Sequence, residues 1–317
     1  MAETKKKKET MAVTKLARLR KRNEFRKKLA ESGGFDIEHL MKKKPHSCDI
    51  TAWKVSKDHC PLDNIIVYAK LGIHKYNMIQ GTNLQLSSIE KYNVRPKVAY
   101  FTYFVTAVAK DPAVGGSLIT FQTSSYIQGF DVKSLTCFIA RPKPEPHGKS
   151  EDQGDNRPTE CGPIDRGRLP EWPADNAFDD KTRYYMVKKS ELRKNDWIRL
   201  YLELAFLDSN LSLPNVLTLS LFTLHERVYA INLSKLVIMK VAVETRENME
   251  SPKERLNARN ATFYIKYKYC PNKSRRACKV DGCRATRERI AIIRRSLDKL
   301  SGLLTLSFHG HWKHTFL

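Results

Sequence analysis

The sequence predicts an α+β protein in which two similar strand-rich blocks follow a basic helical arm. The first block spans about residues 76–144 and the second about 190–269, and both are rich in Val, Ile, Thr, Tyr and Phe. A polar stretch with several prolines and glycines separates the blocks. Both share the order strand, turn, strand, loop, strand, which indicates two copies of one small antiparallel fold.

Just before the first block, the apolar run Ile65–Ala69 predicts a buried strand. The apolar residues between Leu84 and Tyr92 are spaced for either a short helix or a strand, and periodicity does not decide between them. Three further strands are expected, at Ala99–Ala109, Ser117–Tyr126 and Ser134–Pro142. Pro and Gly in the connections predict an antiparallel meander with short turns.

The second block is expected to consist of strands, at Trp197–Leu207, Lys235–Thr245, Ala261–Tyr269, Arg289–Leu297 and Leu304–Phe308. Within the third of these, apolar and polar side chains alternate: Phe263, Ile265 and Tyr267 against Tyr264, Lys266 and Lys268. One face of that strand can therefore be buried while the other stays in water.

The chain is long enough, at 317 residues, for two domains and a tail. The expected parts are a basic, largely helical or disordered arm at 1–44, a first unit at 45–144, a Pro/Gly-rich linker at 145–180, a second unit at 181–308 and a tail at 309–317.

Positive charge is concentrated in two regions. The net charge is +23, and residues 1–44 hold 15 Lys and Arg against 6 Asp and Glu. Residues 266–295 hold 11 Lys and Arg against 2 Asp and Glu, so each region contributes a net charge of +9. Such a localised field favours a polyanionic partner: nucleic acid, an anionic membrane surface or an acidic protein.

The basic arm is a candidate nuclear-import signal. Its candidate residues are Lys5, Lys6, Lys7, Lys8, Arg18, Arg20, Lys21 and Arg22. A solvated arm with no specific role is the first alternative, and direct contact with nucleic acid is the second.

A second basic cluster is a candidate nucleic-acid site, formed by Lys266, Lys268, Lys273, Arg275 and Arg276. Tyr264, Tyr267 and Tyr269 interleave with it, and aromatic rings between phosphate-binding cations can stack on bases. The alternative is an ordinary strand with one tyrosine face packed in the sheet and one lysine face in solvent.

The sequence predicts an intracellular protein, in the nucleus, the cytoplasm or both, with no membrane partner. The most apolar stretch, Leu211–Leu224, is interrupted by Pro214 and is too short to span a bilayer. The first 30 residues lack the apolar core of a secretory signal. The seven cysteines are an odd number and cannot all pair within the chain, which fits a reducing compartment.

No catalytic, cofactor or metal site is predicted, and no small-molecule substrate is evident. The phosphate-binding and dinucleotide glycine motifs are absent. Cys270, Cys278 and Cys283 are spaced more widely than the cysteine pairs of zinc sites. Two looser sets remain as weaker metal candidates: His309, His311 and His314, and His46, Cys48, His59 and Cys60. We therefore expect a protein that is not an enzyme.

Six strings in order carry a resemblance: YNMIQGTNLQLSSIEKYN at Tyr76–Asn93, AKDPA at Ala109–Ala113, LTCFIARPKP at Leu135–Pro144, NDWIRLYLEL at Asn195–Leu204, KVAVETRENMESPKERLNARNATFYIKYK at Lys240–Lys268 and RIAIIRRSLD at Arg289–Asp298. Together they resemble a plant-specific family of uncharacterised proteins related to a male-sterility protein and an embryo-defective protein. The resemblance implies tandem cystatin-like units, each a curved antiparallel sheet with a short helix. Residues 208–232 do not match the family pattern. They are either a real insertion or an error in the gene model.

A cystatin-like fold suggests inhibition of cysteine proteases, but the inhibitory Gln-x-Val-x-Gly pattern is absent, and Asn93–Ala99 reads NVRPKVA. Inhibition is therefore a disfavoured alternative. The leading interpretation is a non-enzymatic protein-binding or scaffold module, acting in reproductive or embryo development as the family resemblance implies. The alternative is association with nucleic acid through the two basic regions.

Overall fold

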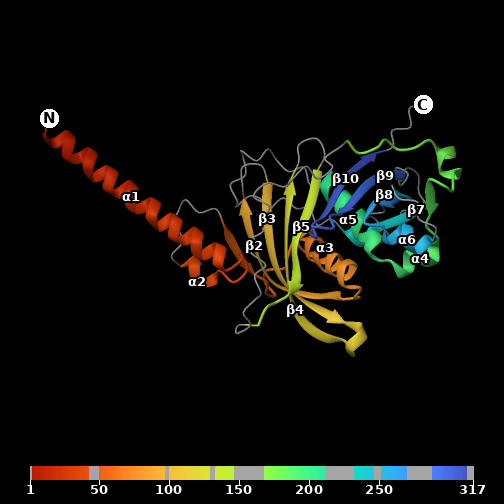
Figure 1. Ribbon diagram of the computed structural model, residues 1–317, viewed down its shortest axis with the longest axis horizontal. Coiled ribbons are helices and arrows are strands. Elements are labelled where there is room, and N and C mark those ends of the chain that lie inside the picture. The colour runs from red at the N-terminus through yellow and green to blue at the C-terminus, as the bar shows by residue number, and fades with distance from the viewer. Residues whose placement is uncertain are drawn as a thin grey trace, which may run out of the picture.

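The computed structural model describes residues 2–42, 50–96, 100–128, 133–145, 168–210, 232–245, 251–269 and 288–312. These form a mixed structure of helices and one large, curved antiparallel sheet, from which a long N-terminal helix projects (Figure 1).

Ten strands make up the sheet in the described part of the chain, in the order β1-β2-β3-β4-β5-β10-β9-β8-β7-β6. Every neighbouring pair is antiparallel. The strands are β1 (Thr51–Lys54), β2 (Gln85–Pro96), β3 (Tyr100–Asp111), β4 (Ser117–Gln128), β5 (Lys133–Pro142), β6 (Tyr184–Met186), β7 (Leu236–Thr245), β8 (Asn260–Tyr269), β9 (Glu288–Leu297) and β10 (Leu304–Trp312).

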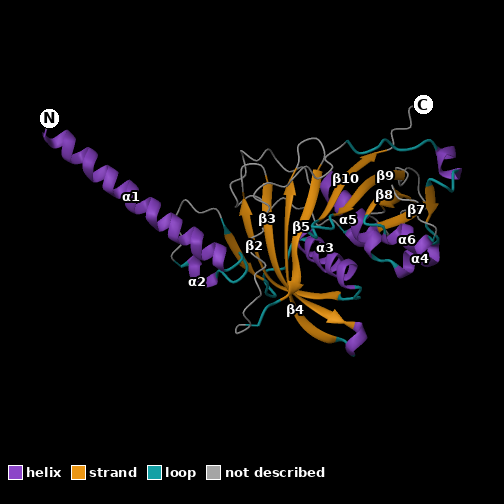
Figure 2. Ribbon diagram, viewed as in Figure 1, coloured by secondary structure: helices purple, strands orange, loops and turns teal. Residues whose placement is uncertain are grey.

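Six α-helices lie in the described residues: α1 (Ala2–Glu31), α2 (Glu38–Met41), α3 (Asp63–Gln80), α4 (Lys189–Lys194), α5 (Trp197–Asn210) and α6 (Pro252–Asn257). Three short 3₁₀ turns accompany them, at Pro112–Val114, Asp175–Asp179 and Leu233–Lys235. Figure 2 shows the helices gathered around the sheet, with α1 standing apart.

The same order of elements occurs twice along the sheet. A short edge strand, a helix and four meandering strands appear first as β1, α3 and β2–β5, and again as β6, α5 and β7–β10. The last strands of the two sets pair with each other, from Leu304↔Cys137 to Phe308↔Lys133. This pairing joins the two halves into one continuous sheet.

The main core lies between the sheet and the helices α3 and α5, which cover the same face. Leu71 of α3 and Tyr201 of α5 are fully buried there, against Val105 of β3 and Phe263 of β8. The close approach of α3 to the sheet depends on Gly72, because a Cβ at that position would lie 2.4 Å from the Cβ of Thr123 on β4.

The prediction of a strand at Trp197–Leu207 is wrong, because this segment is the helix α5. Its buried side chains include Ile198, Tyr201, Leu202 and Ala205, at the spacing i, i+3, i+4 and i+7 that places them on one helical face. The run contains β-branched and aromatic residues that favour strands, and residues 200–207 are buried on every side of the helix, so the apolar pattern alone does not separate a helix from a strand.

The predicted strand at Ile65–Ala69 is also wrong, since these residues are the start of α3. A five-residue apolar window cannot distinguish a buried strand from one turn of a buried helix. The helix ends at Gly81, whose φ of 68° supplies the left-handed residue typical of a helix C-terminus. The undecided segment 84–92 is a strand, within β2.

The other strand predictions are confirmed as β3, β4, β5, β7, β8, β9 and β10. In β8, Phe263, Ile265 and Tyr267 point into the main core as expected. Tyr264 on the opposite face is buried as well, because Trp172 and Phe178 pack over it. The expectation that this whole face stays in water is therefore wrong at Tyr264.

Candidate functional site

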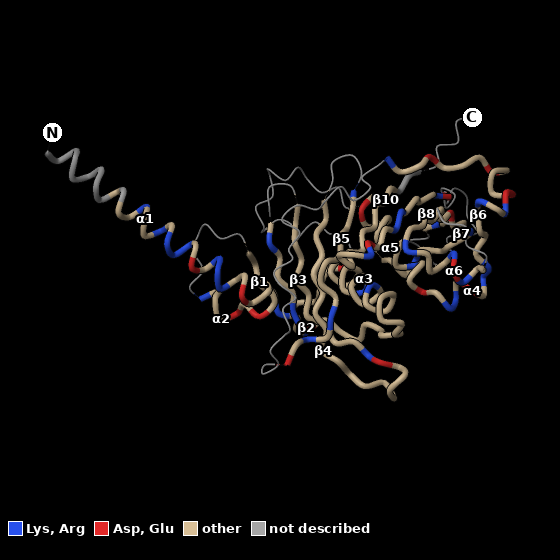
Figure 3. The backbone as a smooth tube through the Cα atoms, viewed as in Figure 1, with Lys and Arg blue, Asp and Glu red and all other residues tan. Residues whose placement is uncertain are grey.

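Most of the described side chains of the basic arm are exposed. From Val13 to Glu24, every described side chain is exposed except that of Arg22, which is half-buried. Figure 3 shows Lys and Arg repeated along this part of α1. Of the nuclear-import candidates, Arg18, Arg20 and Lys21 are exposed on the helix, whereas the side chains of Lys5–Lys8 lie outside the described residues.

Among the side chains that the structure describes, those that attach the arm to the molecule lie at its C-terminal end. Phe25 and Leu29 are buried there against Ile37, Leu40 and Ile50. These residues form a small core of their own, separate from the main one. The exposed part of α1 is therefore held through a single short contact.

The turn that follows α1 is fixed to the sheet face opposite α3. The amide of Asn93 donates hydrogen bonds to the carbonyl oxygens of Gly34, at 2.7 Å, and Phe35, at 2.8 Å. The ring of Phe104 packs edge-on against Phe35, and it leaves no room for a Cβ at Gly34, which has a φ of 85°. Because Val105 faces α3, its neighbour Phe104 faces the other side of the sheet.

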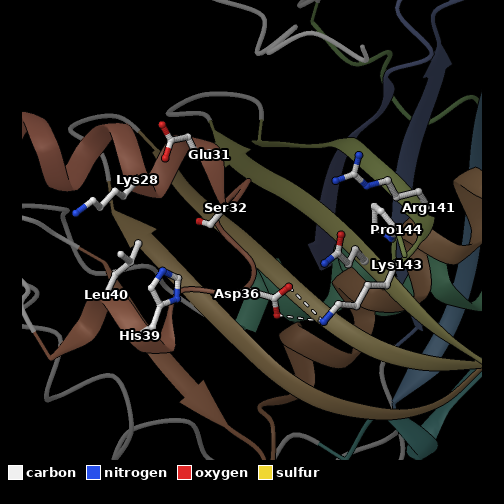
Figure 4. Close-up of a pocket in the computed structure, with 10 residues that line it drawn as sticks. Lys28, Glu31, Ser32, Asp36, His39, Leu40, Arg141, Lys143 and Pro144 are labelled. Carbon is white, nitrogen blue, oxygen red and sulfur yellow. Dashed lines mark hydrogen bonds and ion pairs between the residues drawn. The ribbon is translucent and has the colours of Figure 1, made fainter. Parts of the chain in front are cut away.

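A cleft of about 700 Å³ opens where the arm meets this face of the sheet (Figure 4). Its arm side is formed by Lys28, Glu31, Ser32, Asp36, His39 and Leu40, and its sheet side by Gln122, Arg141, Lys143 and Pro144. Gln122 and Arg141 are direct cross-strand neighbours in the β4–β5 register. The backbone N–H of Lys143 donates to the Thr120 carbonyl at 2.8 Å, so the chain beyond β5 stays against β4.

Asp36 is the acidic centre of the ion pairs in this cleft. Lys91 Nζ lies 2.6 Å from its Oδ1 and Lys143 Nζ lies 3.2 Å from its Oδ2. Burial alone would raise the pKa of Asp36, but the hydrogen bonds from Lys91 and Lys143 outweigh it and hold the pKa below its usual value. Lys91 also contacts Glu38 on α2, so these ion pairs fix α2 and the turn to β2.

Arg141 in the wall of the cleft has a donor without a hydrogen-bond partner among the described residues. It makes no ion pair there, and its Nε is buried without an acceptor. Its cross-strand neighbour Gln122 is only 3% exposed. Buried polar groups in native proteins are normally hydrogen-bonded, so Arg141 leaves an unused donor at the cleft wall.

The structure does not assemble the predicted nucleic-acid site in the residues it describes. Lys266 and Lys268 both face Glu288 on β9, at 2.6 and 3.7 Å. The hydrogen bond from Lys266 is the main cause of the lowered pKa of Glu288. Lys273, Arg275 and Arg276 lie outside the described residues.

The tyrosines that interleave with this cluster are engaged in packing. Tyr267 and Tyr264 are buried on opposite faces of the sheet, and the Tyr269 ring lies 4.7 Å from that of Phe206. Of the two readings of this segment, the structure supports a packed tyrosine face more than a stacking platform. The positive charges of Lys266 and Lys268 are balanced in part by the negative charge of Glu288, so these lysines do not form a free cationic surface.

The weaker metal candidates are not brought together in the described residues, among which no group of three or more His, Cys, Asp or Glu side chains has metal-binding geometry. His59 stacks on Trp53 at 4.9 Å and hydrogen-bonds with the Tyr92 hydroxyl at 3.1 Å. Cys270, Cys278 and Cys283 lie outside the described residues, as do His46, Cys48 and His314.

Sequence reasoning missed a buried polar cluster between the two halves of the sheet. His74 of α3 hydrogen-bonds with the Tyr201 hydroxyl of α5 at 2.9 Å and stacks on Trp197 at 5.2 Å. Arg295 of β9 is 1% exposed and lies 5.1 Å from the Trp197 ring centroid. No sequence motif could have revealed the cluster, because His74 and Tyr201 are 127 positions apart.

The charges in this cluster are controlled by burial. Burial lowers the pKa of His74 to about 3, and the nearby guanidinium of Arg295 acts in the same direction, so His74 is neutral at physiological pH. Backbone oxygens satisfy one nitrogen of Arg295, because its Nη2 donates to the carbonyls of Leu256 and Ala258. Its Nε is buried without an acceptor among the described residues. A cleft of about 560 Å³ between α3 and the start of α5 reaches His74 and Trp197 from outside.

None of the helices in the described residues is both long enough and apolar enough to cross a membrane.

Comparison with known proteins places the chain among plant proteins. Residues 169–306 match the family described as Protein MS5. UPF0725 protein At4g17990 of Arabidopsis thaliana is 38% identical over 93% of this chain and 97% of its own length. UPF0725 protein EMB2204 of the same plant is 36% identical over 75% of this chain and 64% of its own length.

A solved structure agrees with these matches. The crystal structure of MS5 from Brassica napus covers 80% of this chain and 99% of its own, with 31% sequence identity and a TM-score of 0.55. The chain therefore belongs to the plant MS5/UPF0725 family, which is related to male-sterility and embryo-defective proteins.

Proposed function

We propose that this protein is a non-enzymatic binding module that holds an acidic protein partner, through the basic arm α1 and the cleft at its base, in reproductive or embryo development. One observation carries the proposal: the exposed cations of α1 stand clear of the sheet, on a helix whose far end is fixed to the rest of the molecule. A cationic helix presented in this way attracts a partner of opposite charge over a Debye length of about 8–10 Å.

The repeated order of edge strand, helix and four strands supports the further proposal that the two halves are tandem cystatin-like units. In this arrangement the last strands of the units pair with each other, and the combined sheet offers a rigid base for the arm. The scaffold role rests on that rigidity.

The use of the interior ionisable groups supports binding rather than catalysis. His74 is held neutral in ring packing. Lys75 donates to the carbonyls of Cys137, at 3.2 Å, and Phe138, at 3.0 Å. Glu203 pairs with Arg199 at 3.1 Å. Each of these groups has a packing role in the fold, and a binding function needs no free acid or base among them.

A charge-reversal experiment tests the proposal. The arm variant carries Arg18→Glu, Arg20→Glu and Lys21→Glu, and the matched control carries Lys189→Glu, Arg193→Glu and Lys253→Glu at exposed positions of α4 and α6. Each tagged full-length protein is used for quantitative affinity capture from floral tissue, followed by mass spectrometry at low and moderate salt. We expect the arm variant to lose a set of acidic proteins that the control retains. Equal capture by both variants would refute the proposal.

Nucleic-acid association remains a second candidate, because the exposed cations of α1 would also suit phosphates. Electrophoretic shifts with single- and double-stranded DNA and RNA over a salt series separate the candidates. Counterion release makes phosphate binding weaken steeply with salt, and the absence of any shift at low salt would remove this candidate.

Nuclear import through α1 is proposed on the same exposed cations. A fluorescent fusion lacking residues 2–24 retains Phe25 and Leu29, so the small core at the base of the arm stays covered. We expect this fusion to lose the nuclear enrichment of the full-length fusion. An unchanged distribution would exclude an import role for the arm.

A further inference from the structure

We propose that the cleft at the base of the arm contains an anion site in which Arg141 and Gln122 receive a carboxylate side chain of the protein partner. This inference rests on the proposed function and names the chemistry of one contact within it. It starts from two adjacent side chains, since Gln122 on β4 and Arg141 on β5 are directly opposite each other and both line the cleft.

The first argument is the missing partner. Arg141 has five N–H donors, and its Nε is buried without an acceptor within the described residues. Gln122, which is 3% exposed, stands directly opposite it. Leaving a buried donor without an acceptor costs free energy, and a bound oxyanion would give the guanidinium an acceptor.

The second argument is geometry. Figure 4 shows the Arg141 side chain extending from the strand into the space that faces the arm, while the Lys28 ammonium points away from it. Lys28 pairs with Glu24 at 2.8 Å, and Lys143 pairs with Asp36. Arg141 is therefore the cation of this cleft that remains for a ligand, and the planar guanidinium can bind a carboxylate through two parallel hydrogen bonds.

The third argument is the charge balance, which favours a carboxylate over a phosphate. Among the lining residues, Lys28 and Lys143 have acidic partners, Glu24 and Asp36, whereas Arg141 pairs with no carboxylate of the described residues. Arg141 therefore contributes one uncompensated positive charge, which one carboxylate neutralises. A dianionic phosphate would leave a net negative charge beside Glu31 and Asp36.

The test uses the full-length protein and a short fluorescein-labelled peptide of alternating glutamate and glycine, measured by fluorescence anisotropy. Arg141→Gln should weaken binding about tenfold or more, since a charge-assisted pair of hydrogen bonds is lost. Arg193→Gln on α4, which makes the same charge change at an exposed position, should leave affinity within about twofold. Arg141→Lys should restore only part of the loss, because it returns the charge without the planar fork.

Two further variants extend the test. Gln122→Glu should weaken binding by placing a negative charge in the site, and Glu31→Gln should strengthen it by removing one. Arg141→Gln breaks no hydrogen bond of Nε among the described residues, so its thermal unfolding should stay close to that of the parent protein.

The outcomes separate this inference from the proposed function. If Arg141→Gln binds the peptide as well as the parent protein does, the anion site is refuted, and capture by the arm variant still decides the function of α1. If Arg141→Gln loses affinity for the peptide while the arm variant keeps its affinity for the peptide, the anion site stands and the role of the arm fails. Tighter binding of a matching phosphoserine–glycine peptide would overturn the assignment of a carboxylate.

Discussion

Arg295 shows how a single buried charge is accommodated at the junction of the two halves. Its guanidinium lies 5.0 Å from the Phe263 ring centroid and 5.1 Å from that of Trp197. Carbonyl oxygens take its Nη2 hydrogens, and the Tyr201 hydroxyl accepts from Nη1 at 3.3 Å. Cation–π contacts and hydrogen bonds in a low-dielectric setting together offset part of the cost of removing this charge from water.

The neutral state of His74 predicts a loss of stability in acid. The unfolded chain binds a proton near the ordinary pKa of 6.5, whereas the folded protein binds it only near pH 3. The unfolded state therefore holds more protons between these values, and stability falls as the pH falls through 6.5. The contribution of His74 should be about 2 kcal/mol smaller at pH 5 than at pH 7.5.

His74→Gln tests this prediction, because glutamine does not titrate and can still hydrogen-bond with Tyr201. Chemical unfolding is measured at several pH values for both proteins. We expect the variant to lose less stability than the parent between pH 7.5 and pH 5, whatever its starting stability. Parallel pH profiles would show that His74 is not held neutral.

At the scale of elements, the sequence predicted strands better than helices. The strands β7–β9 were predictable because each is a ten-residue run rich in β-branched or aromatic residues. The helices α3 and α5 were missed because they lie under the sheet and are apolar on most of their surface, so strand-favouring residues such as Ile65 and Ile198 dominate short windows.

The contact between α3 and β4 leads to a second prediction. Gly72→Ala places a Cβ against Thr123, and the main core must shift to receive it. We expect a loss of about 1–3 kcal/mol in the free energy of unfolding, although alanine favours helices more than glycine does. A gain in stability would contradict the packing described here.

A double-mutant cycle with Thr123→Gly isolates this contact. The Thr123 hydroxyl is buried without a hydrogen-bond partner in the described part of the chain, so its removal costs no hydrogen bond there. If the clash causes the loss, Gly72→Ala should be much less harmful in the Thr123→Gly background. Additive effects would assign the loss to another cause.

The base of the arm leads to a third prediction. Phe25→Ala together with Leu29→Ala removes the two buried side chains that attach α1. A polar helix without a packed face is marginal in water, so α1 should lose helicity while the sheet keeps its own unfolding transition. Limited trypsin digestion should cut the arm faster than in the parent protein.

Leu16→Ala together with Leu19→Ala is the matched control, because both leucines are exposed on the same helix. Its digestion rate should equal that of the parent. If trypsin cuts α1 no faster in the Phe25→Ala, Leu29→Ala variant than in the parent protein, the arm is attached in another way.

At the scale of the molecule, the sequence predicted two similar blocks but not the way in which they join. The pairing of β5 with β10 links residues about 170 positions apart, such as Thr136 and Thr305, whose hydroxyl groups lie 2.9 Å apart. Local patterns contain no information on such a pairing. The same limit applies to the cleft, whose Lys28 and Arg141 come from opposite ends of the first half.

The basic arm was predictable from composition, since charge density needs no tertiary information. The second basic cluster gave an incomplete picture, because the compensating acid, Glu288, is about twenty residues from Lys268 in sequence but directly opposite it across the β8–β9 ladder. Glu288 also pairs with Lys266. Net charge in a sequence window therefore overstates the free positive charge on a paired strand.

The central claim is that both halves belong to one sheet, which gives the arm and the cleft a rigid base. Native-state amide hydrogen exchange, resolved by residue, tests this claim most directly. We predict that the hydrogen-bonded amides of Leu304–Phe308 and Lys133–Cys137 exchange as slowly as those of β3 and β8, with one shared free energy of opening. Fast exchange across the β5–β10 pairing, beside protected strands in each half, would contradict it.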